Sequence, residues 1–234
     1  MPCWTQLTKH PAWRILAACK GKTFLNLTNG TPSQALRASA RLQTLGAQGY
    51  LTVATMTTPS LVGAETSFLF CSGRSSHRAT ALEVLGLFGR MEDLGDDPAA
   101  ASVHDLALLA AMYGMFDGAL TGIAMLCKAL SAGSLAGGGR RKQGPVTATT
   151  ATHMVPMQTA ILPSLVHIAE QVETSSDSAG DHLNHMMLQG LRNIVLVGGK
   201  MGVDAGAARH LMKVFEQVEA EGGGDGGIGL VGRK

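Results

Sequence analysis

The most constraining feature of this 234-residue chain is a run of 22 residues, 106–127, with a single charged side chain, Asp117. At a rise of about 1.5 Å per residue, such a helix could cross a bilayer or form the centre of a soluble domain. Gly114, Gly118 and Gly122 permit close helix packing in either setting. A carboxylate near the middle costs about 2.5–3.5 kcal/mol in a membrane, and no aromatic belt marks the ends. We therefore expect a soluble helix, covered on most sides as at the centre of a dimer, and no membrane.

The segment before this run has the pattern of an α/β layer. Residues 23–27, 50–54 and 67–71 are short apolar runs that predict buried strands. Thr31 and Pro32 predict the start of a helix that extends to about Leu45, and a second amphipathic helix is predicted over 77–88. The order predicted for this part of the chain is therefore β-α-β-β-α.

From Pro98 onward the pattern is helical throughout. After the long apolar helix, a glycine-rich basic loop precedes three further predicted helices, at about 152–172, 182–197 and 204–221, with a kink at Pro163. We expect an irregular N-terminus over 1–21, a partial α/β segment over 22–97, a helical domain over 98–221 and a flexible glycine-rich tail over 222–234.

Composition excludes several classes of protein. The net charge of +2 and the 4% aromatic content do not predict nucleic-acid binding. The four cysteines are far apart, which favours neither a zinc site nor a disulfide framework: Cys3, Cys19, Cys71 and Cys127. The residues before Cys19 lack the apolar run of about 7–15 residues that a secretory leader needs. A cytoplasmic location is therefore expected.

Two other clusters could bind ligands. His182 and His185 could share a helix face, with Asp181 nearby, but no cysteine or further carboxylate is spaced to complete a metal site. We expect no metal. The basic residues 140–142 could hold a phosphate, or they could form a solvated loop.

Asp105 is the candidate catalytic residue, because it stands among Val103, Leu106 and Leu108. A carboxyl group near apolar surface favours its protonated form and can exchange protons near neutral pH. Tyr113 follows eight residues later, about 12 Å along the helix, so both polar tips could line one elongated cleft. The alternative is an acidic residue favoured by the helix dipole, together with a tyrosine of the core.

Two motifs resemble a known family. Residues 26–32 read Asn-Leu-Thr-Asn-Gly-Thr-Pro, and residues 102–109 read Ser-Val-His-Asp-Leu-Ala-Leu-Leu. Together they resemble imine reductases, and the second is closest to the fungal reductive aminases. Shorter matches are Met-Thr-Thr-Pro at 56–59, Ser-Gly at 72–73 and Leu-Gly-Asp-Asp at 94–97. The resemblance extends from about Lys22 to Glu221.

This resemblance implies an NADPH-dependent oxidoreductase that transfers hydride to an imine or iminium carbon, with an imine, or an amine plus a carbonyl compound, as substrate. The implied fold is a remnant of a Rossmann α/β sheet followed by an all-α domain built on a long interdomain helix. Two chains would exchange helical domains as a homodimer. Asp105 would handle the proton or stabilise the cationic nitrogen, Tyr113 would hydrogen-bond to the substrate, and Asn29 would lie beside the nicotinamide.

The sequence departs from the family pattern in two respects. No strand followed by Gly-x-Gly-x-x-Gly precedes Asn26, so we expect a shortened oxidoreductase, with a non-catalytic dimerisation module as the alternative. A hydroxyacid dehydrogenase fragment ranks lower, because that family relies on a lysine early in the long helix, and here the first lysine, Lys128, stands just after the far end of the run. Met157 and Met187 stand where the family has a pocket tryptophan and a pocket glutamine, so we expect an altered substrate pocket, although methionines also fill cores. The candidate residues of this pocket are Met56, Met157, Met186 and Met187.

Overall fold

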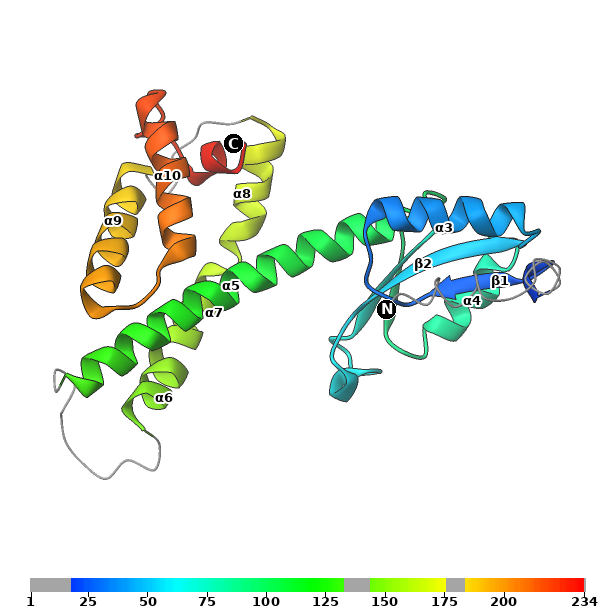
Figure 1. Cartoon of the computed structure of the whole chain (residues 1–234), viewed down its shortest axis with the longest axis horizontal. Coiled ribbons are helices and arrows are strands. Elements are labelled where there is room, and N and C mark those ends of the chain that lie inside the picture. The colour runs from blue at the N-terminus through cyan, green and yellow to red at the C-terminus, as the bar shows by residue number, and fades with distance from the viewer. Residues whose placement is uncertain (1–17, 133–143, 176–183, 234) are drawn as a thin grey trace. The chain divides into compact units, whose positions relative to one another are not determined.

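A computed structural model describes residues 18–132, 144–175 and 184–233 of the chain (Figure 1). The chain divides into two compact units, the first ending at Met112 and the second beginning at Tyr113. This division falls inside the long helix, rather than at residues 97–98 where the sequence predicted it. The reason is that the first turn of that helix packs on the sheet, where Ala101 joins a core cluster with Ala54 and Phe70.

The first unit contains a four-stranded sheet with the order β1-β2-β3-β4. Its strands are β1 (Thr23–Asn26), β2 (Gly49–Met56), β3 (Phe68–Ser72) and β4 (Arg90–Asp93). β1 pairs with β2 in parallel, β2 with β3 antiparallel, and β3 with β4 in parallel. The three predicted strands are confirmed. β4 was missed because its sequence, Arg-Met-Glu-Asp, holds one apolar residue and so lacks the run that signals a buried strand.

Two helices cover opposite faces of this sheet. Helix α3 (Pro32–Thr44) begins with a capping box between Thr31 and Gln34 and packs in one core cluster with Tyr50. Helix α4 (Arg78–Leu85) packs in a second cluster with Leu51. Tyr50 and Leu51 are consecutive residues of β2, so their side chains point to opposite faces. A 3-10 turn, η1 (Pro59–Leu61), follows β2.

The long apolar run forms α5 (Ala100–Ser131). By length and composition alone, α5 is the one helix in the described part of the chain that could cross a membrane. Its most apolar window of 18 residues has no share buried within the chain. Within the described part of the chain, this stretch of α5 is therefore not covered in the way that the sequence predicts.

The second unit continues with a series of helices. They are α6 (Pro145–Thr149), the π-helical turn η2 (Thr150–Met154), α7 (Val155–Ile161), α8 (Ser164–Glu173), α9 (Asn184–Met201) and α10 (Gly206–Ala220). Where the sequence predicted a kink at Pro163, the structure has a break between α7 and α8, with Pro163 at the N-cap of α8. Helices α9 and α10 lie side by side (Figure 1), with Leu188, Phe215 and Val218 buried.

The glycine-rich tail differs from the flexible segment that the sequence predicted. It folds back on the unit and ends in a 3-10 helix, η3 (Ile228–Arg233). Asn184 donates its backbone N–H to the carbonyl of Gly226 at 3.2 Å and its side-chain amide to the carbonyl of Gly223 at 3.0 Å. Gly229 donates its N–H to Gln171 Oε1, and a Cβ on Gly229 would lie 2.5 Å from the Cβ of Gln171. The glycines therefore permit close packing.

Three of the residues considered from sequence lie outside the described ranges, together with the basic loop. His182 and Asp181, from the metal-site hypothesis, are among them, as are Cys3 and residues 140–142. Within the described ranges, no group of three or more His, Cys, Asp or Glu side chains could hold a metal ion.

Candidate active site

The loop after β1 is shaped by Asn26, the last residue of that strand. Its Oδ1 accepts hydrogen bonds from the N–H of Thr28 at 3.2 Å and from the Thr28 hydroxyl at 2.7 Å. Its Nδ2 donates to the hydroxyl of Tyr50 on β2 at 3.0 Å. Such a side-chain turn reverses the chain immediately after the strand. The Asn-Leu-Thr motif is therefore a turn whose geometry sets the position of Asn29.

Thr31 starts α3 two residues after Asn29. Its hydroxyl accepts from the N–H of Gln34, and the Gln34 side chain accepts from the N–H of Thr31 at 2.8 Å. This reciprocal pair satisfies donors that a helix start otherwise leaves unpaired. Asn29 is thus held between a fixed turn and a capped helix.

The start of α5 is held by three hydrogen bonds, two of which involve residues of the sheet. Ser72 Oγ, at the end of β3, accepts from the N–H of Ala101 at 2.9 Å. Thr52 Oγ1 donates to the carbonyl of Pro98 at 2.7 Å, and Asp97 Oδ1 accepts from the N–H of Ala99 at 2.9 Å. These contacts fix both the position and the rotation of the first turn of α5.

Gly73, which follows Ser72, meets a strict backbone requirement. Its φ is +119°, and a Cβ there would lie 2.3 Å from the carbonyl oxygen of Tyr50. Only glycine fits this close approach in this conformation. The Ser-Gly pair seen in the sequence therefore has two structural roles, one for each residue.

Asp105 lies four residues after Ala101, on the same face of α5. Its side chain accepts a hydrogen bond from Asn29 Nδ2 to Oδ2 at 2.6 Å. Asp105 is only 7% exposed, which confirms that the carboxyl group is held away from bulk solvent. The sequence separated these residues by 76 positions, and the structure joins them. A carboxylate with one oxygen held by an amide is suited to balancing positive charge on a bound ligand.

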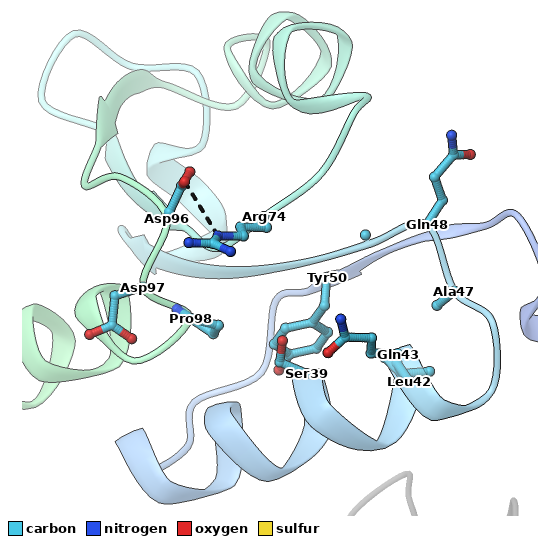
Figure 2. A pocket seen from close by; sticks show the side chains of 11 residues that line it. Ser39, Leu42, Gln43, Ala47, Gln48, Tyr50, Arg74, Asp96, Asp97 and Pro98 are labelled. Carbon is cyan, nitrogen blue, oxygen red and sulfur yellow. Dashed lines mark ion pairs between the residues drawn. The ribbon is translucent and has the colours of Figure 1, made fainter.

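Two cavities lie on either side of Tyr50. One, of about 380 Å³, extends along α3 from Asn26 and Asn29 to Arg41 and includes Ser102 of α5. The other, of about 470 Å³, is shown in Figure 2, where Ser39, Gln43 and Tyr50 lie opposite the ion pair between Arg74 and Asp96. Asn29, which donates to Asp105, lines the first of these cavities, whereas Asp105 itself is not one of its lining residues.

The arginines of the first cavity were not identified from sequence. Arg37 and Arg41 both line it from α3, one helical turn apart. A signal was present, since the spacing of four residues places both on one face of the helix predicted after the Asn-Gly-Thr-Pro motif.

Tyr113 belongs to the second unit and is 61% exposed. Its exposure does not fit the alternative of a core tyrosine. Its role beside Asp105 stays a prediction.

The four methionines of the predicted substrate pocket are divided between the two units. Met56 packs in the first unit against the core cluster of Ala54, Phe70 and Ala101. Met187 lines an apolar cavity of about 220 Å³ in the second unit, whereas Met157 and Met186 are exposed and do not line it. The substrate role of all four stays a prediction.

Comparison with known proteins decides the family. No family model matches the chain. The chain is 32% identical over 214 residues to an NADPH-dependent reductive aminase of Aspergillus oryzae (strain ATCC 42149 / RIB 40), covering 89% of this chain and 67% of that protein. This chain belongs to the imine reductase and reductive aminase family. The resemblance inferred from the two motifs is thereby confirmed.

Solved structures of imine reductases and reductive aminases confirm the fold class. A reductive aminase of Aspergillus terreus in complex with NADPH and ethyl-5-oxohexanoate matches with a TM-score of 0.79 at 32% identity, covering 91% of this chain and 69% of that one. An imine reductase of Myxococcus stipitatus in complex with NADP⁺ matches with a TM-score of 0.78 at 22% identity, covering 93% and 72%. NADPH is thus the cofactor named for the relatives, and the chain spans about two thirds of their length.

Proposed function

We propose that this chain takes part in the NADPH-dependent reduction of an imine or iminium ion, with Asp105 as the catalytic carboxylate. The observation that supports this most is the 2.6 Å hydrogen bond between Asn29 and the buried Asp105. It joins the two motifs on which the family resemblance rests. The substrates would be an imine, or an amine together with a carbonyl compound.

The residues present fit the nicotinamide end of NADPH. Asn29 follows the carboxyl end of β1, which pairs in parallel with β2, and ligands of α/β sheets bind at such ends. When bound, NADPH supplies the hydride for the carbon of the C=N bond. Among the strands that the structure describes, none is followed by Gly-x-Gly-x-x-Gly, so we assign no residue of that motif to the pyrophosphate.

Asp105 would stabilise the cationic nitrogen and handle its proton. Charges interact more strongly where water is excluded, so a carboxylate that is 7% exposed acts more strongly than one at the surface. Because the Asn29 amide binds Oδ2, we assign Oδ1 to the substrate nitrogen. We propose that Tyr113 forms a hydrogen bond to the substrate. The proposed residues of the substrate pocket are Met56, Met157, Met186 and Met187.

We also propose that α5 is covered by a second copy of the chain, in a homodimer that exchanges helical domains. The support is its apolar surface, since the most apolar window of α5 is not buried within the chain. Among its exposed residues are Leu120 at 65% and Phe116 at 47%. Leu120→Asp should convert a dimer to a monomer in sedimentation equilibrium. A wild-type chain that is monomeric at every concentration would contradict the proposal.

The same surface favours a second candidate function, a non-catalytic dimerisation module. Titration of the purified chain with NADPH separates the two functions. Saturable binding followed by turnover of cyclohexanone and allyl amine, the compounds seen with an Aspergillus terreus reductive aminase, supports the reductase. A dimer that binds no NADPH at millimolar concentrations supports the module.

The role of Asp105 is tested by Asp105→Asn, which keeps the shape of the side chain and removes its charge. Turnover, followed by NADPH consumption, should fall about 10²–10⁴-fold. Asp117→Asn is the matched control, because Asp117 lies on the same helix and is exposed. Unchanged turnover in Asp105→Asn would remove the assignment.

We place this activity in the cytoplasm. The support is that Cys19, Cys71 and Cys127 are all free thiols, as a reducing compartment would keep them. Imaging of a fluorescent fusion in the source cells tests this, and a signal confined to a membrane or an organelle would contradict it.

A further inference from the structure

A pair of unneutralised arginines lines the cavity beside α3. Arg37 and Arg41 are exposed, and neither has an ion-pair partner among the residues that the structure describes. The other arginines whose side chains are described are each paired with a carboxylate: Arg74, Arg78, Arg90, Arg192 and Arg209. The two described arginines without a carboxylate partner therefore line the same cavity.

The spacing of these arginines makes the pair unfavourable in an empty cavity. Residues four apart on a helix are neighbours, and like charges there destabilise the helix by about 0.2–0.5 kcal/mol. A bound oxyanion would reverse the sign of this effect, because it would interact favourably with both guanidinium groups. The planar guanidinium group also matches carboxylate and phosphate oxygens in two parallel hydrogen bonds.

The rest of the cavity limits what kind of molecule could carry the oxyanion. Ala35, Ala38 and Tyr50 give it an apolar floor, while Asn26 and Asn29 give it amides at the far end. Side chains on a helix lean toward its N-terminus, so both arginine side chains lean toward the end where Asn29 lies. A volume of about 380 Å³ suits a small molecule.

We propose that the cavity beside α3 binds a small molecule through an oxyanion, a carboxylate or a phosphate, held between Arg37 and Arg41. The apolar part of this ligand would lie on Ala35, Ala38 and Tyr50. The oxyanion has two possible sources, the carboxylate of an oxo acid and the phosphate of a dinucleotide. The cavity shares Asn29 with the proposed nicotinamide site, but the test below measures anion binding by the arginines and not turnover, so the failure of this site and the failure of the reductase activity are distinguishable.

Isothermal titration calorimetry of the full chain tests the site with three probes: 5-oxohexanoate, its uncharged ethyl ester and inorganic pyrophosphate. At least one anion should bind, and the double variant Arg37→Gln/Arg41→Gln should weaken that binding by about tenfold or more. Preference for 5-oxohexanoate over its ester identifies the carboxylate source, and binding of pyrophosphate identifies the phosphate source.

Two controls accompany this measurement. Arg192→Gln removes an equal charge from an exposed and paired arginine of the second unit, and it should leave anion binding unchanged. Arg37→Lys/Arg41→Lys keeps both charges without the guanidinium geometry, and it should bind the anion with part of the wild-type affinity. This variant provides the test if the double glutamine variant fails to fold. If neither anion binds, or if a folded double glutamine variant binds as tightly as the wild type, the proposal is overturned.

Discussion

The two units differ in how they bury apolar side chains. The first unit encloses core clusters on both faces of its sheet, with Leu42, Leu51 and Leu69 fully buried. The second unit buries Leu188, Phe215 and Val218, yet it exposes much apolar surface, including Leu120, Val166 and Leu196. A core of the first kind stabilises a chain by itself, whereas exposed apolar surface of this extent marks an interaction site. The described residues of the first unit therefore enclose a core of their own, whereas the second unit leaves large apolar side chains exposed on most of its helices.

The largest effect is expected in the first unit, at Gly73. Gly73→Ala adds a Cβ 2.3 Å from the carbonyl of Tyr50 in a backbone conformation that favours glycine. The free energy of unfolding should fall by more than about 4 kcal/mol, measured by urea denaturation. Gly95→Ala is the control, since its φ is also positive but no atom lies within 4 Å of the added Cβ. Its cost should be about 1–2 kcal/mol. Equal losses in both variants would show that the close approach does not limit stability.

A leucine in each unit makes the comparison direct. Leu69→Ala removes a side chain with no exposure. The free energy of unfolding, measured by urea denaturation, should therefore fall by about 2–5 kcal/mol at every protein concentration. Leu120→Ala removes a side chain that is 65% exposed, so the free energy of unfolding of the monomer should change by about 0.5 kcal/mol or less. The cost of Leu120→Ala should grow with protein concentration if a second copy covers α5. A cost that is large even at high dilution would contradict the contrast between the units.

The tail of the second unit allows a smaller test. Gly229→Ala places a Cβ 2.5 Å from Gln171 Cβ and should destabilise the unit by about 1–3 kcal/mol. Gly190→Ala lies in helix α9 with no atom within 4 Å, so it should stabilise the helix by about 0.5–1 kcal/mol. Thermal unfolding measures both changes: the midpoint temperature should fall for Gly229→Ala and rise for Gly190→Ala. A neutral Gly229→Ala would indicate that the tail is flexible, as the sequence predicts.

The smallest expected effect is on how the stability of the protein depends on pH, through the buried Cys71. Burial raises the pKa of the Cys71 thiol, and the nearby Arg78 guanidinium offsets part of this rise. A raised pKa in the folded state contributes stability that is present below the unfolded pKa of about 8.5 and is lost as the pH rises through the folded value. Cys71→Ser should remove this decline of stability at alkaline pH.

Alkylation near pH 8 tests the same contrast, with mass spectrometry to locate the label. The exposed Cys127 of the second unit should react well before Cys71. Faster labelling of Cys71 would contradict its burial.

The sequence predicted the parts of the fold that depend on local patterns. The bounds of β1 and α3 follow from an apolar run and from the Thr31 cap, and Pro163 predicted the break before α8. The pairing of the strands could not be predicted, because parallel and antiparallel neighbours depend on contacts between distant segments. The ordered tail was missed for a similar reason, since glycines that permit close packing look the same in sequence as glycines in a flexible segment.

The candidate site was predicted in part. Asn29 and Asp105 were identified from two motifs, but their hydrogen bond was not. The two residues are 76 positions apart and meet only because the first unit folds. Ser72 was noted only as part of a matching pair, and its bond to Ala101 depends on how α5 meets the sheet. Arg37 and Arg41 attracted no attention because a lone pair of arginines on a helix is an ordinary pattern until a cavity is found beside it.

The attachment of α5 to the end of β3 has a consequence for how such chains can tolerate insertions and deletions. Ala101 is held by Ser72, and Asp105 reaches Asn29 from one helical turn further on. One residue inserted between Ala101 and Asp105 would rotate the Asp105 carboxylate by about 100° around the helix axis, away from the Asn29 amide. Relatives that keep this pair should therefore vary in the identity of residues 102–104 long before they vary in their number.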